Sequence, residues 1–241
     1  MKIFCVRIGE KYGPEYEEYL ERKLPEYDFV WIRKPFMKGV ALQWNKMQVM
    51  GMDIDEPVVV MDIDIILTGN YKEIFDYPIN RGQFLAMPGW WRRLGADQWK
   101  INGGFFKYYP SDMNYLYNIF VSNPKMWQQK FIKDGTTAGP VNGEQHFVEM
   151  GVKDANMELI ILPNSWFTRW ATPDVVERPL RYEGGSYEDW QYEITKLYKE
   201  KTGNDYLYMD GEFHPDIKFI HFTNSLNKPH NWEDYKYFVD E

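Results

Sequence analysis

An uninterrupted apolar run, Val58-Val59-Val60-Met61, constrains the fold more than any other part of the chain. A strand that is apolar at every position fits a parallel sheet covered on both faces, since a strand with one wet face would alternate. The preceding residues alternate strand and helix: Lys2–Ile8, a helix opened by Pro14, Asp28–Ile32, and a helix through Val40, Trp44 and Met47 that ends near Gly51. This βαβαβ order predicts the α/β class, with a mixed, mainly parallel central sheet flanked by helices.

Two carboxylates, Asp62 and Asp64, follow this strand directly. In such sheets ligands bind beyond the carboxyl ends of the strands, which is where these side chains are expected. Like charges at positions i and i+2 repel one another unless a cation lies between them. A hard divalent cation suits the pair because it takes oxygen ligands and shares them with substrate phosphates. The pattern indicates a metal site; the alternative is a strand end with one solvated Asp and one turn Asp.

The composition limits the class of protein. The chain has 241 residues and a net charge of −8 with no block of Lys or Arg, which argues against a nucleic-acid partner. The single Cys5 excludes a disulfide within the chain and indicates a reducing compartment. No apolar run reaches membrane-spanning length, and the Met1 end is expected to be a strand, not a signal peptide. We therefore expect a soluble, cytoplasmic protein. Its aromatic content of 18% suits either a sugar-binding cleft or an ordinary core.

The rest of the chain is expected to complete one domain, since no linker divides it. The segment Pro173–Phe213 is polar and rich in Tyr, and the spacing of Trp190, Ile194, Leu197 and Tyr198 predicts one amphipathic helix within it. Further strands are predicted at Gln83–Met87, Gly104–Tyr108, Leu159–Leu162 and Lys218–Phe222.

One candidate site residue precedes Asp62 in the sequence, and one candidate segment follows it. Lys46, on the helix before the apolar strand, can return to the same sheet edge and bind a sugar hydroxyl or a phosphate; the alternative is a surface lysine. The glycines of Asn102-Gly103-Gly104 permit unusual backbone angles and close approach of a ligand; the alternative is a turn that enters a strand.

Two further candidates lie in the second half of the chain. Glu144 and Gln145 follow a glycine, so they can face a reacting sugar or simply start a helix with an acid in its first turn. His221 leaves an apolar strand and is either a third metal ligand or a core histidine.

In this order the clusters resemble the motifs of glycosyltransferases of the GT-A fold, closest to family eight, the group of glycogenin and bacterial galactosyltransferases. There a helix with Lys or Arg precedes a strand ending in Asp-x-Asp, as Lys46 precedes Asp62-Ile63-Asp64. Asn102-Gly103-Gly104 resembles the family's Asn-Ala/Ser-Gly, and Gly143-Glu144-Gln145 its Gly-Asp-Gln. The segment from His221 through Lys228-Pro229 to Trp232 resembles its closing His-x-x-Gly-x-x-Lys-Pro-Trp, with one extra residue before Lys228 and without the Gly.

The resemblance implies a single GT-A, Rossmann-like nucleotide-binding domain, residues 1–241, with a nucleotide-sugar-binding half (1–110) and an acceptor-side half (111–241) that carries the metal and phosphate motif. It implies a hexosyltransferase of polysaccharide or glycan biosynthesis, which moves a sugar from a nucleotide-diphosphate sugar such as a UDP-sugar to a hydroxyl of a glycan or other acceptor, with retention. Mn²⁺ or Mg²⁺ would be bound by Asp62, Asp64 and His221. The donor would be bound by Lys46, Asn102, Gly103, Gly104 and Lys228, and Glu144 and Gln145 would be catalytic.

Two other classes stay open. A sugar-1-phosphate nucleotidyltransferase would use the same carboxylates, but such enzymes carry a basic, glycine-rich loop after the first strand, and Gly9-Glu10-Lys11-Tyr12-Gly13-Pro14 matches it poorly. A non-catalytic carbohydrate-binding protein would explain the ten tryptophans, but such modules are more often all-β sandwiches. Glycoside hydrolysis is disfavoured because its two carboxylates lie several ångströms apart across a cleft.

Overall fold

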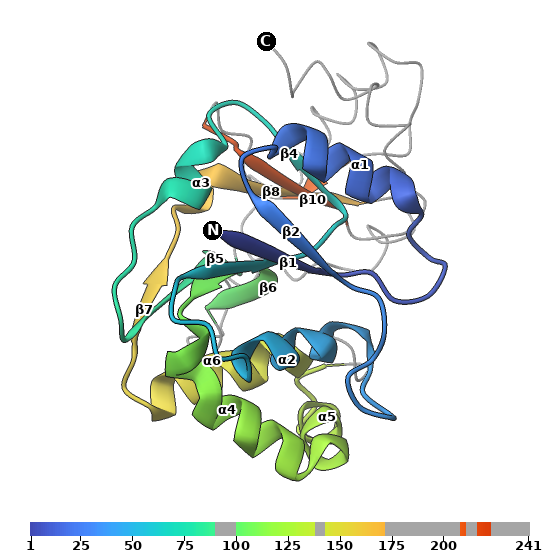
Figure 1. Ribbon diagram of the computed structural model, residues 1–241, viewed down its shortest axis with the longest axis vertical. Helices are drawn as coiled ribbons and strands as arrows, with labels where there is room; N and C mark the ends of the chain where they lie inside the picture. The colour runs from blue at the N-terminus through green and yellow to red at the C-terminus, as the bar shows by residue number, and fades with distance from the viewer. Residues whose placement is uncertain (90–99, 138–142, 172–207, 211–215, 223–241) are drawn as a thin grey trace, which may run out of the picture. The chain divides into compact units, whose positions relative to one another are not determined.

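The chain divides into two compact units in the computed structural model, which describes residues 1–89, 100–137, 143–171, 208–210 and 216–222 (Figure 1). Unit 1 comprises Met1–Ile63, Tyr77–Pro88 and Trp99–Leu162. Unit 2 comprises Asp64–Asp76, Gly89–Gln98 and Pro163–Glu241. That residues 1–241 act as one domain stays a prediction.

Unit 1 contains a six-stranded sheet in the order β2-β1-β3-β6-β5-β7. The pairs β1–β2, β1–β3 and β5–β7 are parallel, and β6 runs antiparallel to both β3 and β5. The predicted α/β class with a mixed, mainly parallel sheet is therefore confirmed. The strands are β1 (Lys2–Val6), β2 (Asp28–Ile32), β3 (Val58–Met61), β5 (Gln83–Pro88), β6 (Ile101–Tyr108) and β7 (Glu158–Ile161).

Helices cover both faces of this sheet. Figure 1 shows α1 on one side of β1 and β2, and α2, α4, α5 and α6 on the other. Pro14 starts α1, with Glu15 and Glu17 in its first turn and Arg22 and Lys23 in its last, as the helix dipole favours. Among the described residues, none of the helices is both long enough and apolar enough to cross a membrane. The helical elements are α1 (Pro14–Lys23), the 3₁₀ turn η1 (Leu42–Lys46), α2 (Met47–Met50), α4 (Pro110–Ser122), α5 (Pro124–Lys133) and α6 (Gly143–Asp154).

The core between the sheet and α2, α4, α5 and α6 fixes where the candidate residues lie. Every residue of β3 is buried, and its Val58 and Val60 face this core. Trp44 is fully buried in η1, stacks on Phe120 with ring centroids 5.0 Å apart, and packs on Phe147 at 5.6 Å. Because the indole of Trp44 is packed in the core, η1 and its last residue, Lys46, are held against the sheet.

Two sequence expectations differ from the structure. In place of the helix predicted through Val40, Trp44 and Met47, the chain forms a 3₁₀ turn followed by a single α-helical turn. The side chains of Trp44 and Met47 are both fully buried in the core, although they lie only three residues apart. The turn considered at Asn102-Gly103-Gly104 is part of β6, which begins at Ile101. The helix predicted from Trp190 lies outside the described residues.

Unit 2 contains a four-stranded sheet in the order β4-β10-β8-β9. Strand β10 runs antiparallel to β4 and parallel to β8, and its His221 is paired in register with Ile65. The elements are β4 (Ile65–Leu67), α3 (Lys72–Asp76), the 3₁₀ turn η3 (Asn164–Trp166), β8 (Phe167–Ala171), β9 (Tyr208–Asp210) and β10 (Phe219–Phe222).

Candidate active site

A β-bulge in β6 forms the centre of the candidate site in unit 1. The register between β5 and β6 shifts from Ala86↔Phe106 to Met87↔Asn102, so residues 103–105 bulge between two paired positions. On the other side of β6, the N–H of Asp62 donates to the carbonyl of Gly104 at 2.9 Å. Bulges redirect the chain and are common beside active sites. This bulge places the predicted Asn-Gly-Gly segment directly beside the first aspartate of the Asp-x-Asp motif.

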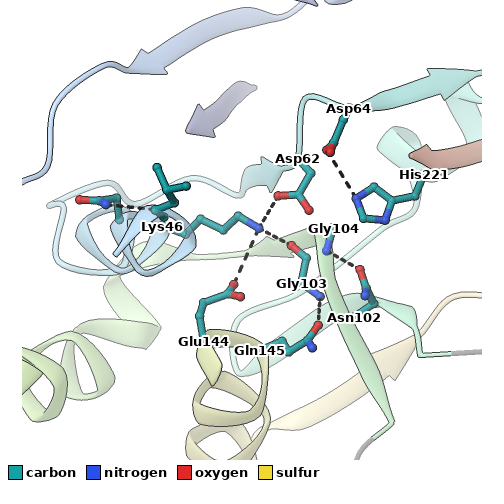
Figure 2. A network of polar contacts seen from close by, with 11 residues as sticks. Lys46, Asp62, Asp64, Asn102, Gly103, Gly104, Glu144, Gln145 and His221 are labelled. Atoms are coloured by element: carbon teal, nitrogen blue, oxygen red, sulfur yellow. Dashed lines mark hydrogen bonds and ion pairs between the residues drawn. The ribbon is translucent and has the colours of Figure 1, made fainter. Parts of the chain in front are cut away.

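Side chains from two distant segments and from β6 itself hold the backbone of the bulge (Figure 2). The carbonyl of Gly103 accepts a hydrogen bond from Nζ of Lys46 at 2.6 Å, and its N–H donates to Oε1 of Gln145 at 2.9 Å. The N–H of Gly104 donates to Oδ1 of Asn102 at 2.7 Å. Unit 1 thus brings together candidate residues that are separated by up to about a hundred positions in sequence.

The two glycines are needed for space rather than for unusual backbone angles. Neither has a positive φ, which corrects the expectation of a special conformation. A Cβ atom on Gly103 would lie 2.8 Å from Oε2 of Glu144, and one on Gly104 would lie 2.7 Å from Sδ of Met87. The missing side chain at Gly103 therefore makes room for the carboxylate of Glu144 beneath the bulge.

Lys46 is buried, with 1% of its surface exposed, which excludes the surface-lysine alternative. Its Nζ lies 2.6 Å from Oδ1 of Asp62 and 3.8 Å from Oε1 of Glu144 (Figure 2). A buried ammonium needs compensation by charge and hydrogen bonds, and here two carboxylates and one carbonyl supply it. One cation therefore holds the metal-motif aspartate, the bulge and the start of α6 in one arrangement.

In the triangle formed by Lys46, Asp62 and Glu144, Glu144 is buried like Lys46, with 2% of its surface exposed, whereas the side chain of Asp62 is 19% exposed. Burial raises the pKa of its carboxyl group from 4.5 to about 7; the ammonium of Lys46 opposes this rise, and the carboxylate of Asp62 adds to it. Within the triangle, Glu144 is thus the group that gains or loses a proton near neutral pH, while Asp62 forms the shorter ion pair with Lys46.

This pKa shift predicts a pH dependence of stability. A carboxyl group with a raised pKa stabilises the fold below the unfolded value of 4.5 and loses that contribution as the pH rises through about 7. Relative to Glu144→Gln, which cannot titrate, the wild-type free energy of unfolding should fall by up to about 3 kcal/mol across this range. Urea denaturation of both proteins over that range measures the difference. A difference that is flat with pH would assign Glu144 an ordinary pKa.

In unit 2, Asp64 and His221 lie together. Nε2 of His221 is 3.5 Å from Oδ1 of Asp64, and the imidazole is 15% exposed, so this residue is not a fully enclosed core histidine (Figure 2). Asp64 is separated from Asp62 by Ile63 alone. The predicted phosphate contact Lys228 lies outside the described residues.

One residue that supports the site was not anticipated from the sequence. Glu149 is fully buried on α6, and its carboxylate accepts hydrogen bonds from the N–H groups of Lys100, at 2.9 and 2.7 Å, and Ile101, at 3.1 Å, while pairing with Lys153 at 2.7 Å. It fixes the start of β6, just as Gln145 fixes the bulge. The sequence spacing could have indicated this role for Glu149, since Gln145 and Glu149 are four residues apart and therefore share one face of the helix.

Solved structures share this fold, which is that of GT-A glycosyltransferases and confirms the predicted fold class. The galactosyltransferase LgtC, solved in complex with donor and acceptor sugar analogs, matches with a TM-score of 0.50 and 10% identity, over 93% of this chain and 87% of that chain. The glycosyltransferase GlyE of Streptococcus pneumoniae TIGR4 matches with a TM-score of 0.50 and 10% identity, over 92% of this chain and 55% of that chain. No protein-family model and no curated protein matches the chain.

Proposed function

We propose that the protein is a metal-dependent glycosyltransferase that moves a hexosyl group from a nucleotide-diphosphate sugar, such as a UDP-sugar, to a hydroxyl of a glycan or other acceptor. The observation that carries the proposal is the Lys46–Asp62–Glu144 triangle, with its buried lysine and glutamate, beneath the β6 bulge at the carboxyl end of β3. That end of a parallel strand is where α/β sheets bind nucleotides. The GT-A fold makes a nucleotide sugar the ligand to test first.

The donor atoms of Asp62, Asp64 and His221 fit a divalent cation of the Mn²⁺ or Mg²⁺ type. Each side chain offers one ligand atom, giving two carboxylate oxygens and one imidazole nitrogen. We expect one ion to bind both carboxylates because a single residue separates them, and the contact between His221 and Asp64 supports the imidazole as a third ligand. When bound, such an ion would neutralise charge on the leaving diphosphate as a Lewis acid.

The chain's own residues would position the donor. Lys46 holds the carboxylate of Asp62 and the carbonyl of Gly103, so it keeps the metal motif and the bulge in register. Lys46 would therefore have two roles: the predicted contact with the nucleotide-sugar donor, and this positioning of the site from a buried location. The amide side chains of Asn102 and Gln145 already bond the bulge and would grip sugar hydroxyls beside it.

Glu144, which lies beneath the bulge, would bind a hydroxyl of the reacting sugar. Lys228 would contact the diphosphate. Transfer with retention is part of the proposal because the family that the motifs resemble retains the anomeric configuration; such a transfer needs no strong general base at the acceptor. The anomeric configuration of the product, read by NMR, tests this part separately.

A screen of nucleotide sugars with Mn²⁺ tests the proposal. The matching donor should raise the melting temperature only when Mn²⁺ is present, with about 2.7 kcal/mol of added stability at a hundred times its dissociation constant. With acceptor, the donor should be consumed and the nucleoside diphosphate released. Pyrophosphate release from a sugar 1-phosphate and a nucleoside triphosphate would instead indicate a nucleotidyltransferase. Sugar binding without turnover or need for metal would indicate a carbohydrate-binding protein.

A further inference from the structure

The acidic residues of the chain are unevenly distributed. Asp and Glu account for 36 of 241 residues, yet none occurs within 29–52 or within 113–133. These two segments contain seven of the basic residues: Arg33, Lys34, Lys38, Lys46, Lys125, Lys130 and Lys133. Lys46 is buried in the candidate site, whereas Lys34, Lys38, Lys125 and Lys133 are exposed. A chain with a net charge of −8 therefore carries two segments of purely positive formal charge.

The structure packs these segments against each other in unit 1. The side chain of Gln128 on α5 accepts a hydrogen bond from the N–H of Ala41 at 2.7 Å and donates one to the carbonyl of Gly39 at 3.1 Å. Phe36 contacts the ring of Phe120 on α4, with centroids 6.2 Å apart. Figure 1 shows the loop that follows β2 close to α5, below the sheet. We call the surface formed by residues 33–42, the C-terminal end of α4 and α5 the basic-apolar face.

The same face carries exposed aliphatic side chains. Among the described residues, Leu42, Ile119 and Met126 are three of the four large hydrophobic residues on the surface, with 39%, 42% and 41% of their area exposed. The indole of Trp127 donates to the carbonyl of Ile119 at 3.0 Å, which ties the end of α4 to α5. Acids at the border of the face include Glu17, which pairs with Arg33 at 2.7 Å, and Asp134, which pairs with Lys130 at 2.7 Å; Asp112 lies at the opposite end of α4.

We propose that the basic-apolar face binds peripherally to bilayers that contain anionic lipid. Aliphatic side chains interspersed with lysines suit such a surface, because the apolar groups enter the interface while the cations attract anionic headgroups. A nucleic acid would use the lysines but leave exposed Leu, Ile and Met without a partner. Since binding to lipid requires neither donor nor metal, the proposal stands or falls independently of the proposed function.

Vesicle co-sedimentation of the full chain tests this inference. Vesicles of equal parts phosphatidylcholine and phosphatidylglycerol should carry the protein into the pellet, and phosphatidylcholine vesicles should do so much less. The double variant Lys34→Glu with Lys38→Glu should reduce partitioning by about tenfold or more, since each basic residue near an anionic surface contributes substantially. Leu42→Ser with Met126→Ser should reduce it several-fold while leaving the charge unchanged.

The matched control is Lys72→Glu with Lys100→Glu, which makes the same change of charge at exposed lysines outside this face. It should keep most of the wild-type binding, and added salt should weaken binding of both proteins. Circular dichroism confirms that each variant is folded. Wild-type protein that stays in the supernatant, equal loss in the control variant, or equal binding to neutral vesicles would each overturn the proposal.

Discussion

Replacing Asp62 by Asn should lower the rate of metal-dependent donor turnover by about 10²–10³-fold, the usual effect of removing one preorganised electrostatic contact to a leaving group. The fold should survive the change. The Asn carbonyl can still accept from the ammonium of Lys46, and Glu144, 3.8 Å from that ammonium, becomes the remaining counter-charge. Since Asp62 raises the pKa of Glu144, its neutralisation favours the ionised form of Glu144. The readouts are nucleoside-diphosphate release and Mn²⁺ affinity.

The control for this prediction is Asp55→Asn, which makes the same change of charge at an exposed aspartate of unit 1 that pairs with Arg81 on the surface. It should leave turnover and Mn²⁺ affinity unchanged. The metal role would be wrong if Asp62→Asn kept a tenth or more of the wild-type rate, or if wild-type turnover persisted in EDTA. Loss of turnover with unchanged Mn²⁺ affinity would instead mean that Asp62 positions Lys46 and does not bind the metal.

The first three strands of the fold were predictable because their signals are local. The strand Val58–Met61 is apolar at every position, and Asp28–Ile32 is rich in β-branched and aromatic residues; both have the predicted bounds. The helices α4 and α5 were not predicted, although each begins with a proline, Pro110 and Pro124, at its first turn. Their apolar faces are formed partly by aromatic residues, which are also common in the strands of this chain. Hydrophobic periodicity alone therefore did not distinguish helix from strand in these segments.

The candidate site was predictable as a set of residues but not as an arrangement. Lys46 contacts Gly103, 57 positions away, and Glu144, and no local pattern states that one ammonium bridges both. The bulge in β6 depends on a register shift against β5, which is a property of strand pairing. Tertiary contacts decide such features, whereas strand and helix patterns report only which face of each element is apolar.

Replacing Lys46 by Met should reduce the free energy of unfolding by about 3–5 kcal/mol above pH 7, because it leaves two carboxylates and one carbonyl without their shared cation. The carboxyl of Glu144 is buried and loses the charge that lowers its pKa, so its pKa should rise above about 7. The destabilisation should therefore shrink as the pH falls and Glu144 takes up a proton. Urea denaturation at several pH values measures both the size of the effect and its slope.

Lys107→Met is the matched control, since Lys107 is also a buried lysine of unit 1, with 5% of its surface exposed, and its Nζ donates to the carbonyl of Tyr77 at 2.7 Å. Its loss should cost about 1–3 kcal/mol, with a smaller dependence on pH than that of Lys46→Met, because Lys107 is not among the groups that shift the pKa of Glu144. Equal, pH-independent losses in the two variants would mean that Lys46 acts as an ordinary buried hydrogen-bond donor. A larger loss for Lys46→Met that fades at acid pH would show that the triangle with Asp62 and Glu144 is held together by charge.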